Sequence, residues 1–390
     1  MYHRILTQHL KRLAKQYPVI TMTGPRQSGK TTLCQSSFPH HQYVNLEALT
    51  TRDFANQDPQ GFLAQFQKGV VLDEIQRTPN LTSYIQTIVD QENKPGRFIL
   101  TGSQQFEMSQ TVNQSLAGRT ALLKLLPLSY SELYGTNAPT IAEILYSGFY
   151  PRIFDKQLNP TEALSFYLNT HVERDIRTLS HIKDLSAFER LLKLCATQIG
   201  QLLNYTTLAN DCGVDQKTVK AWLSLLEASY IIYQIQPHYA HFRKRLTKSS
   251  KLYFYDVGLA SYLLGITRVE HINAHPLKGL LFENFIISEC LKNCFNHVKN
   301  SNLYFFRDHV GHEIDLILDY GHVLYSVEIK STETIQADFF KGLNFYHELA
   351  EKKNAKRFII YGGGKSYEMR NVKIYSYLHL EKFFEEIARA

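Results

Sequence analysis

The sequence has few cysteines, little net charge and no long apolar run, and each shortage excludes a class of protein. Its five cysteines form no CxxC pair, which argues against a disulfide framework or a cysteine-based metal site. No apolar run approaches the roughly 18 residues that a membrane helix needs. The basic N-terminal segment is periodic and lacks the apolar core of a signal peptide. We therefore expect a reduced, cytoplasmic protein with no membrane partner.

The charge and apolar content are those of an ordinary globular protein. Lys and Arg outnumber Asp and Glu by 43 to 36, so the formal net charge is only +7. This mild excess permits an anionic partner without requiring one. The 44% hydrophobic content is enough for packed cores and excludes a disordered or fibrous chain. At roughly 100–200 residues per domain, the length predicts two to four domains.

The pattern of apolar residues changes twice along the chain. The first part has short apolar runs at 18–24, 69–75 and 97–103, which are typical of buried parallel strands, and 43–47 is a fourth candidate. The middle is mostly helical by its spacing, and the last part returns to mixed strands and helices. We expect an α/β fold of three domains, which comprise residues 1–160, 161–270 and 271–390.

The strongest motif is GPRQSGKT at residues 24–31, which matches the phosphate-binding pattern GxxxxGK[ST] at every fixed position. Its glycines let the backbone fold around a phosphate without a Cβ clash, and the helix N-terminus that follows favours an anion. We expect Lys30 to reach the β- and γ-phosphates and the Thr31 hydroxyl to ligate Mg²⁺. The expected nucleotide-binding residues are Gly24, Pro25, Arg26, Gln27, Ser28, Gly29, Lys30, Thr31 and Thr32.

Two acids end the apolar run at 70–74, as in a Walker B strand. We expect Asp73 to hold the Mg²⁺ shell and Glu74 to polarise the attacking water, because phosphoryl transfer needs mainly positioning and charge neutralisation. The acid pair favours water as the acceptor, and hence an NTP hydrolase over a small-molecule kinase. Ser103, after the next run, is either a sensor of the water or γ-phosphate or only a polar strand cap. Arg119 is either an arginine finger for a neighbouring subunit's nucleotide or a surface arginine.

A second charged constellation lies near the C-terminus. Glu328 and Lys330 are two residues apart and share one face of a strand. With Asp315 on the preceding strand and Glu283 on an earlier helix, they follow the PD-(D/E)xK pattern of restriction-endonuclease-like nucleases. The three acids would hold Mg²⁺ or Mn²⁺, and Lys330 would orient or deprotonate the attacking water. The alternative is a solvated strand face with alternating charges.

Strand register decides whether Asp315 joins this group. A two- or four-residue loop is expected to pair Leu318 with Val323, which leaves Asp315 diagonal to Glu328, roughly 7–8 Å away at Cα. A three-residue loop would turn one strand over and break the site.

The middle of the chain contains a helix, a Gly-centred turn and a second helix, followed by two strands around a basic segment. This order predicts a helix-turn-helix with a basic wing. Such modules bind DNA through a recognition helix and phosphate contacts, and they also serve as protein–protein connectors. The residues that would face DNA are Gln216, Lys217, Thr218, Lys220, Arg243, Lys244, Arg245 and Lys248.

Nearly the whole chain resembles the prokaryotic AAA-type ATPases that carry a C-terminal domain of unknown function with a restriction-endonuclease-like fold. Beside the phosphate-binding loop, the segments SLAGRTALLKLLPLS and DVGLASYLLG point to this family. The resemblance implies an ASCE-type P-loop ATPase core with a mostly parallel sheet, then a winged helix, then a nuclease-like domain. It also implies that ATP and ADP are the nucleotides bound.

Two hypotheses of function follow. In the first, the protein processes DNA, and ATP gates metal-dependent cleavage at Asp315, Glu328 and Lys330. In the second, it is a slowly hydrolysing signalling or scaffold switch, whose C-terminal domain binds protein or nucleic acid without cutting it. A trans-acting Arg119 would require a nucleotide-dependent homo-oligomer. A small-molecule kinase is a third and weaker hypothesis.

Overall fold

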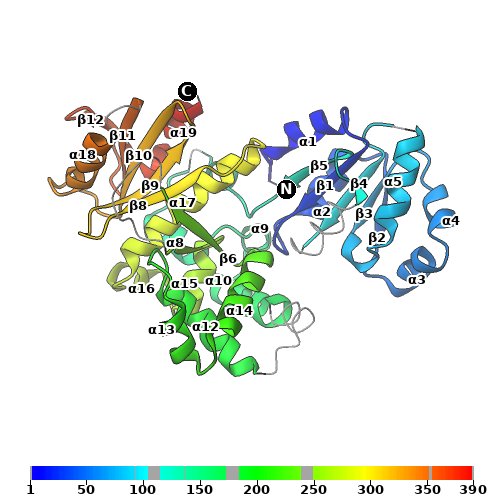
Figure 1. Cartoon of the computed structure of the whole chain (residues 1–390), viewed down its shortest axis with the longest axis horizontal. Helices are drawn as coiled ribbons and strands as arrows, with labels where there is room; N and C mark the ends of the chain where they lie inside the picture. Colours follow the sequence, from blue (N-terminus) through cyan, green and yellow to red (C-terminus); the bar gives the residue numbers. More distant parts are fainter. Residues whose placement is uncertain are drawn as a thin grey trace.

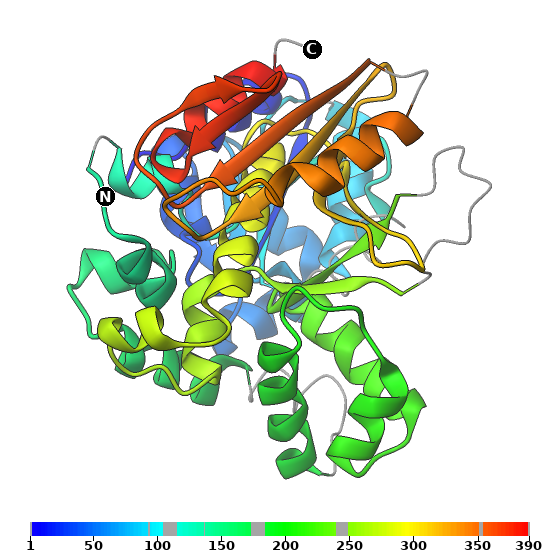
Figure 2. The same cartoon turned by 90° about the vertical axis from the view of Figure 1, so that its left-hand side faces the viewer.

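The computed structural model describes residues 2–92, 94–103, 115–135, 137–172, 184–238, 249–350 and 354–388. Two β-sheets lie at opposite ends of the molecule in Figure 1, one built from N-terminal and one mainly from C-terminal residues. The helices between residues 184 and 230 lie at the bottom of both views (Figures 1 and 2).

The N-terminal sheet has five strands in the order β2-β3-β4-β1-β5, and all its neighbouring pairs are parallel. The strands are β1 (Val19–Thr23), β2 (Gln42–Asn45), β3 (Val70–Asp73), β4 (Phe98–Gly102) and β5 (Thr120–Lys124). Every residue of β1, β3 and β4 is buried, as expected of apolar strands with helices on both faces. The predicted α/β fold with a parallel sheet is therefore confirmed.

The strand order determines which loops meet at the carboxyl ends of the strands. β4 lies between β1, which precedes the phosphate-binding loop, and β3, which ends in the acid pair, as an ASCE-type core requires. Because the strands are parallel, their carboxyl ends meet at one edge, where ligands of α/β sheets bind. The accompanying helices are α1 (Leu6–Ala14), α2 (Lys30–Ser37), α3 (Leu49–Gln57), α4 (Pro59–Ala64), η1 (Ile75–Arg77) and α5 (Leu81–Glu92).

Helices follow the N-terminal sheet up to residue 228. They are α7 (Tyr130–Tyr134), α8 (Ile141–Ser147), α9 (Pro151–Asp155), α10 (Pro160–Tyr167), η2 (Leu168–Val172), α12 (Leu185–Thr197), α13 (Tyr205–Cys212) and α14 (Gln216–Ala228). α13 and α14 occupy the expected helix-turn-helix positions, and Gly213 ends α13 at a φ of 72°, which glycine adopts without strain. The basic residues expected at 243–248 lie outside the described residues.

The second sheet has eight strands in the order β12-β13-β11-β10-β9-β8-β6-β7. They are β6 (Ile232–Pro237), β7 (Lys251–Phe254), β8 (Leu303–Arg307), β9 (Glu313–Asp319), β10 (Val323–Lys330), β11 (Asn354–Tyr361), β12 (Tyr367–Met369) and β13 (Val372–Ser376). β6 and β7 are the two strands expected to flank the wing, and they pair with each other. β6 also pairs with β8, so these strands extend the C-terminal sheet. A separate winged-helix domain stays a prediction.

One hydrophobic core runs from Leu126 to Ile387 and crosses both residue 160 and residue 270. At its centre is α17 (Lys278–Asn296), which buries fourteen of its nineteen residues. The remaining helices of this part are α15 (Val257–Leu263), α16 (Val269–Ala274), α18 (Phe339–Leu349), η3 (Tyr377–His379) and α19 (Leu380–Ala388). Because they share this core, the middle and C-terminal parts stabilise each other, and the predicted domain boundaries stay untested.

All five cysteines lie in described parts of the chain, where their thiols are buried and free. Within those parts, no helix combines the length and the apolar character needed to cross a membrane.

The core predicts the cost of removing one aromatic ring of α17. Phe285 is fully buried and stacks on Phe149, with ring centroids 5.6 Å apart. We expect Phe285→Ala to lower the free energy of unfolding by about 3–5 kcal/mol, because the change leaves a cavity. Denaturant unfolding followed by circular dichroism measures this cost. Phe166→Ala is the control, since that side chain is 66% exposed; equal losses in both variants would contradict the central place of α17.

Candidate functional site

The phosphate-binding loop joins β1 to α2, and its two motif glycines are required by the backbone. Gly24 has a φ of 152°, and a Cβ there would lie 2.1 Å from the carbonyl oxygen of Leu125. Gly29 has a φ of 94° at the N-terminus of α2. Both conformations disfavour other residues. The loop is therefore held tightly against the neighbouring strand, with a helix N-terminus at its end.

Lys30 lies buried inside the loop that precedes it. Its ammonium group donates hydrogen bonds to the carbonyl oxygens of Gly24 and Pro25, both at 2.8 Å. Burial lowers the pKa of Lys30 to about 8, although the carboxylates of Glu74 and Asp73 act in the opposite direction. The two loop carbonyls thus hold the ammonium group inside the phosphate-binding loop.

The acid pair meets polar residues from several strands at the same edge of the sheet. Asp73 accepts hydrogen bonds from the hydroxyls of Thr31 and Tyr43, both at 2.8 Å, and from Thr101 of β4. Thr31 and Asp73 are therefore adjacent, as two residues that share one Mg²⁺ shell must be. Hydroxyl and carboxylate oxygens are the ligand types that Mg²⁺ prefers, so these residues fit the ion.

Glu74 lies just beyond β3 with left-handed backbone angles, φ 59° and ψ 47°. Its carboxylate accepts hydrogen bonds from Gln76 and from the Ser103 hydroxyl, the latter at 3.1 Å. Ser103 follows β4, the strand next to β3, which explains why the two side chains meet. The structure thus brings Ser103 to the predicted water-polarising acid.

A cavity of about 540 Å³ opens over the loop. Glu74 lies at its wall. The cavity is also lined by five residues of the GPRQSGKT motif and by the residue after it, namely Arg26, Gln27, Gly29, Lys30, Thr31 and Thr32. Gly24, Pro25 and Ser28 do not line this cavity, and Ser28 is fully buried. Sequence analysis missed three charged lining residues, namely Arg4 before α1 and Arg152 and Asp155 of α9. None of the three belongs to a sequence motif that predicts a nucleotide contact.

Arg119 lies away from this cavity. It precedes β5, and Thr120 pairs with Val19 at the start of β1, whereas the phosphate-binding loop follows the end of β1. Its guanidinium group instead pairs with Asp90, with contacts of 2.5 and 2.8 Å. Arg119 therefore does not line the cavity over the phosphate-binding loop of its own chain, and a role toward a neighbouring subunit stays a prediction.

The C-terminal constellation depends on the pairing of β9 with β10. The predicted pairing of Leu318 with Val323 is wrong by two residues, because Leu318 faces Tyr325 and Asp319 faces Leu324. The turn residues extend the ladder, with the amide of Tyr320 bonded to the carbonyl of Val323 at 3.1 Å. A shift of two preserves which face each side chain occupies, so Asp315 still lies on the face of Glu328.

The predicted acids and lysine converge on a cavity of about 530 Å³. The Lys330 ammonium group lies 3.1 Å from an Asp315 oxygen and 2.7 Å from a Glu328 oxygen. Glu283 enters from α17, where its carboxylate accepts from Tyr253 at 2.6 Å and from Lys251 at 3.1 Å. Lys251 was not expected here, because it lies on β7, far in the sequence from Asp315, Glu328 and Lys330.

The carboxylates of this cavity are crowded. Burial and the neighbouring Asp315 charge raise the pKa of Glu328 to about 8, and one Glu328 oxygen is buried without a hydrogen-bond partner. Burial also raises the pKa of Glu283. Among the described residues, no group of three or more His, Cys, Asp or Glu side chains is arranged to hold a metal ion. The metal-ligand role of Glu283, Asp315 and Glu328 stays a prediction.

Three family models match successive parts of the chain. Residues 16–134 match an AAA domain, residues 138–270 match a Domain of unknown function (DUF8612), and residues 278–381 match a Domain of unknown function (DUF4143). Together with the loop geometry, the first match supports a P-loop NTPase domain similar to AAA domains in the N-terminal part. The restriction-endonuclease-like character of the last part stays a prediction.

The chain is similar to proteins of two bacteria. The chain is 29% identical to Uncharacterized protein Rv2008c of Mycobacterium tuberculosis over 83% of this chain and 73% of that protein. It is 23% identical to an Uncharacterized protein of Haemophilus influenzae over 70% of this chain and 74% of that one. Among solved structures, the Walker-type ATPase PABY2304 of Pyrococcus abyssi has a TM-score of 0.39 at 13% identity and covers 66% of this chain and 94% of its own. A DNA replication initiation factor has a TM-score of 0.26 at 16% identity, over 55% and 69%.

The lowered pKa of Lys30 predicts that nucleotide affinity falls in alkaline solution. Above about pH 8 the free protein loses the Lys30 proton, and with it the attraction to phosphate. We expect the Kd for ATP to rise by up to about tenfold per pH unit above this value, and binding there to take up a proton. Calorimetry in buffers of different ionisation enthalpy measures both. Lys30→Arg, which stays protonated, should show a flat profile; a flat profile in the natural protein would contradict the assignment.

Proposed function

We propose that this chain is a Mg²⁺-dependent ATPase whose nucleotide state is transmitted to its C-terminal module. One observation supports the ATPase part above all others. Lys30 and Thr31 at the start of α2, Asp73 and Glu74 at the end of β3, and Ser103 after β4 meet beside one cavity at the carboxyl edge of a parallel sheet. Phosphoryl transfer depends mainly on positioning and charge neutralisation, and this set supplies both.

Each residue has a defined task in the proposed reaction. Lys30 exchanges its loop carbonyls for the β- and γ-phosphates, while Thr31 and Asp73 hold Mg²⁺. The ion neutralises phosphate charge when bound. Glu74 accepts a hydrogen bond from the attacking water and polarises it, and Ser103 holds the Glu74 carboxylate in place at 3.1 Å.

Two sets of buried contacts support transmission to the C-terminal module. The first begins at Thr23, which ends β1 immediately before the phosphate-binding loop. Its hydroxyl is 2.7 Å from that of Tyr230, a fully buried residue between α14 and β6. The Tyr230 ring packs on Tyr255, just after β7. A movement at the end of β1 is therefore passed through Tyr230 to the residues that flank β6 and β7 of the second sheet.

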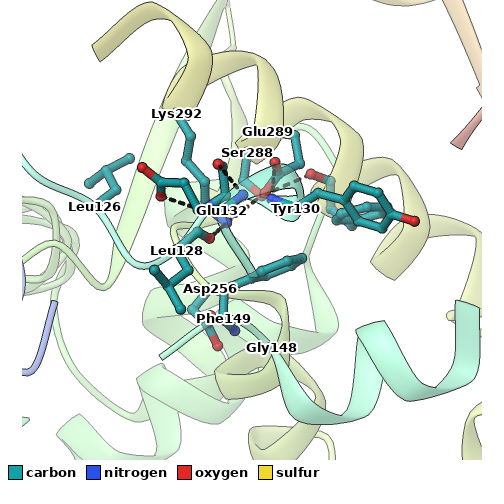
Figure 3. A network of polar contacts seen from close by, with 12 residues as sticks. Leu126, Leu128, Tyr130, Glu132, Gly148, Phe149, Asp256, Ser288, Glu289 and Lys292 are labelled. Carbon is teal, nitrogen blue, oxygen red and sulfur yellow. Dashed lines mark hydrogen bonds and ion pairs between the residues drawn. The ribbon is translucent and has the colours of Figure 1, made fainter. Parts of the chain in front are cut away.

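The second set joins α17 to the segment after β5 (Figure 3). A Glu289 oxygen accepts a hydrogen bond from the Tyr130 amide at 2.7 Å, which fixes the start of α7. Lys292 pairs with Glu289 at 2.7 Å and donates to the Leu128 carbonyl at 2.9 Å. Since all these groups are buried, separating them would leave charges unpaired, which is costly.

α7 is in turn tied to the phosphate-binding loop. Glu132 of α7 forms a buried ion pair with Arg4 at 3.1 Å. Arg4 donates to the Ser28 carbonyl, inside the loop, at 2.8 Å. A continuous buried chain of contacts therefore runs from the loop to α17, which also carries Glu283 of the C-terminal cavity.

Action on DNA is the second candidate function. The convergence of Asp315, Glu328 and Lys330 on one cavity favours it, as do Lys217 and Lys220, which are exposed on α14. In the alternative, the same module docks a protein or nucleic acid without cleaving it, and the ATPase acts as a switch. Nucleotide-dependent assembly into homo-oligomers is compatible with both candidate functions.

Two substitutions separate nucleotide binding from hydrolysis. We expect Lys30→Ala to abolish ATP binding. Glu74→Gln should retain binding but lower turnover by about 10²- to 10⁴-fold, the usual contribution of a general base. Phosphate release and a fluorescent-nucleotide titration measure the two effects. Arg119→Ala is the control at low protein concentration, where a neighbouring subunit is absent. Turnover that survives in both site variants would contradict the proposed reaction.

A further experiment tests transmission and DNA action together. We expect double-stranded DNA to raise ATP turnover several-fold in the natural protein. Tyr230→Phe removes the bond to Thr23 and should lose most of this stimulation while it keeps basal turnover. Plasmid nicking is followed in the same Mg²⁺ and Mn²⁺ reactions, with Lys330→Ala as the nuclease-site variant. Turnover indifferent to DNA, with intact plasmid, would contradict DNA action and favour a protein-directed switch.

A further inference from the structure

Lys251, the first residue of β7, places a charged group deep inside the C-terminal cavity. Only 1% of the residue is exposed. Its ammonium group lies 3.1 Å from a Glu283 oxygen of α17 and 2.5 Å from a Glu313 oxygen of β9. A buried ammonium group is costly unless it is paired, so these two carboxylates are what keep Lys251 there.

The neighbours of Lys251 hold it in that position. Tyr253, two residues along β7 and on the same face, donates a hydrogen bond to the same Glu283 oxygen at 2.6 Å. The Phe305 ring of β8 lies 5.6 Å from the ammonium group. The side chain is therefore fixed by residues of α17, β8 and β9, although it comes from β7, the second strand after α13 and α14.

Every carboxylate of the cavity is paired with a basic group. Lys251 lies between Glu283 and Glu313 and pairs with both, and the second Glu313 oxygen is 3.1 Å from Arg307. The two remaining acids share Lys330. Each carboxylate thus has at least one oxygen against an ammonium or guanidinium group, and the second Glu328 oxygen is buried without a partner. Because basic groups occupy the positions that a metal ion would take between the acids, the cluster does not fit a divalent cation as it stands. An added dication would also be repelled by the buried Lys251 charge.

We propose that Lys251 is the built-in counter-cation of this acidic cluster and excludes Mg²⁺ and Mn²⁺ from its carboxylates while it stays in place. Lys251 differs from Lys330, the lysine of the expected nuclease pattern, whose side chain is 33% exposed at the end of its strand. It is a positioning residue that acts through Glu283 and Glu313. The proposal is independent of the ATPase reaction.

Mn²⁺ binding to the full chain without nucleotide tests this directly. Free Mn²⁺ is counted by electron paramagnetic resonance, in an Asp73→Asn background so that the phosphate-binding loop contributes nothing. We expect no Mn²⁺ binding that depends on Glu283 when Lys251 is present. Lys251→Met should bind one Mn²⁺ at least about tenfold more tightly, and the ion should raise the thermal unfolding midpoint of that variant alone.

Matched variants identify the source of any gain. Lys341→Met removes an exposed lysine of α18 that also pairs with an acid, and it should behave like the natural protein. Lys251→Met combined with Glu283→Gln should lose the gained site. Lys251→Arg should keep the cluster closed to Mn²⁺.

Two results would overturn the proposal. One is tight Mn²⁺ binding to the protein with Lys251 intact that Glu283→Gln removes, a result that needs no Lys251 variant to fold. The other is unchanged or weaker Mn²⁺ binding in a folded Lys251→Met, which would make Lys251 a bystander or a support for the metal. These Mn²⁺-binding results do not depend on ATP hydrolysis, so a variant that loses ATP hydrolysis still tests the role of Lys251.

Discussion

The burial of α17 is the constraint on which the rest of the structure depends. A helix enclosed for most of its length must pair every polar side chain that it carries, because an unpaired buried charge is costly. Glu289 and Lys292 satisfy each other and the backbone near α7, and Glu283 is satisfied by β7. The positions of the N-terminal sheet, of the edge strands and of the C-terminal cavity are thereby linked through one helix.

This arrangement suits a protein that transmits a local change over a distance. The phosphate-binding loop is connected to the second sheet by Thr23 and Tyr230, and to α17 through Arg4 and Glu132. Both routes reach the C-terminal cavity, where Lys251 of β7 meets Glu283 of α17. Close-packed interiors have low compressibility and transmit strain. A displacement along either route would therefore move Lys251 relative to Glu283.

The features that the sequence predicts correctly are local ones. The glycines and Lys30 of the phosphate-binding loop lie in the expected strand–loop–helix setting, since a backbone conformation depends on a few adjacent residues. Ser103 lies beside Glu74 because parallel strands bring their carboxyl ends together. The pairing of β9 with β10 was misplaced by two residues, yet the face of Asp315 was right, because only the parity of the register determines the face.

The sequence by itself determined the phosphate-binding loop, the acid pair at the end of β3 and the spacing of Glu328 and Lys330, because the residues of each feature lie within a few positions of one another. Only the tertiary structure decided that Arg119 faces Asp90 rather than the nucleotide cavity, that Arg4 and Arg152 line that cavity, and that the wing strands join the C-terminal sheet. It also decided that Lys251 enters the acidic cluster. These contacts join residues far apart in the chain, and no local pattern encodes a partner that only the folded core brings within reach.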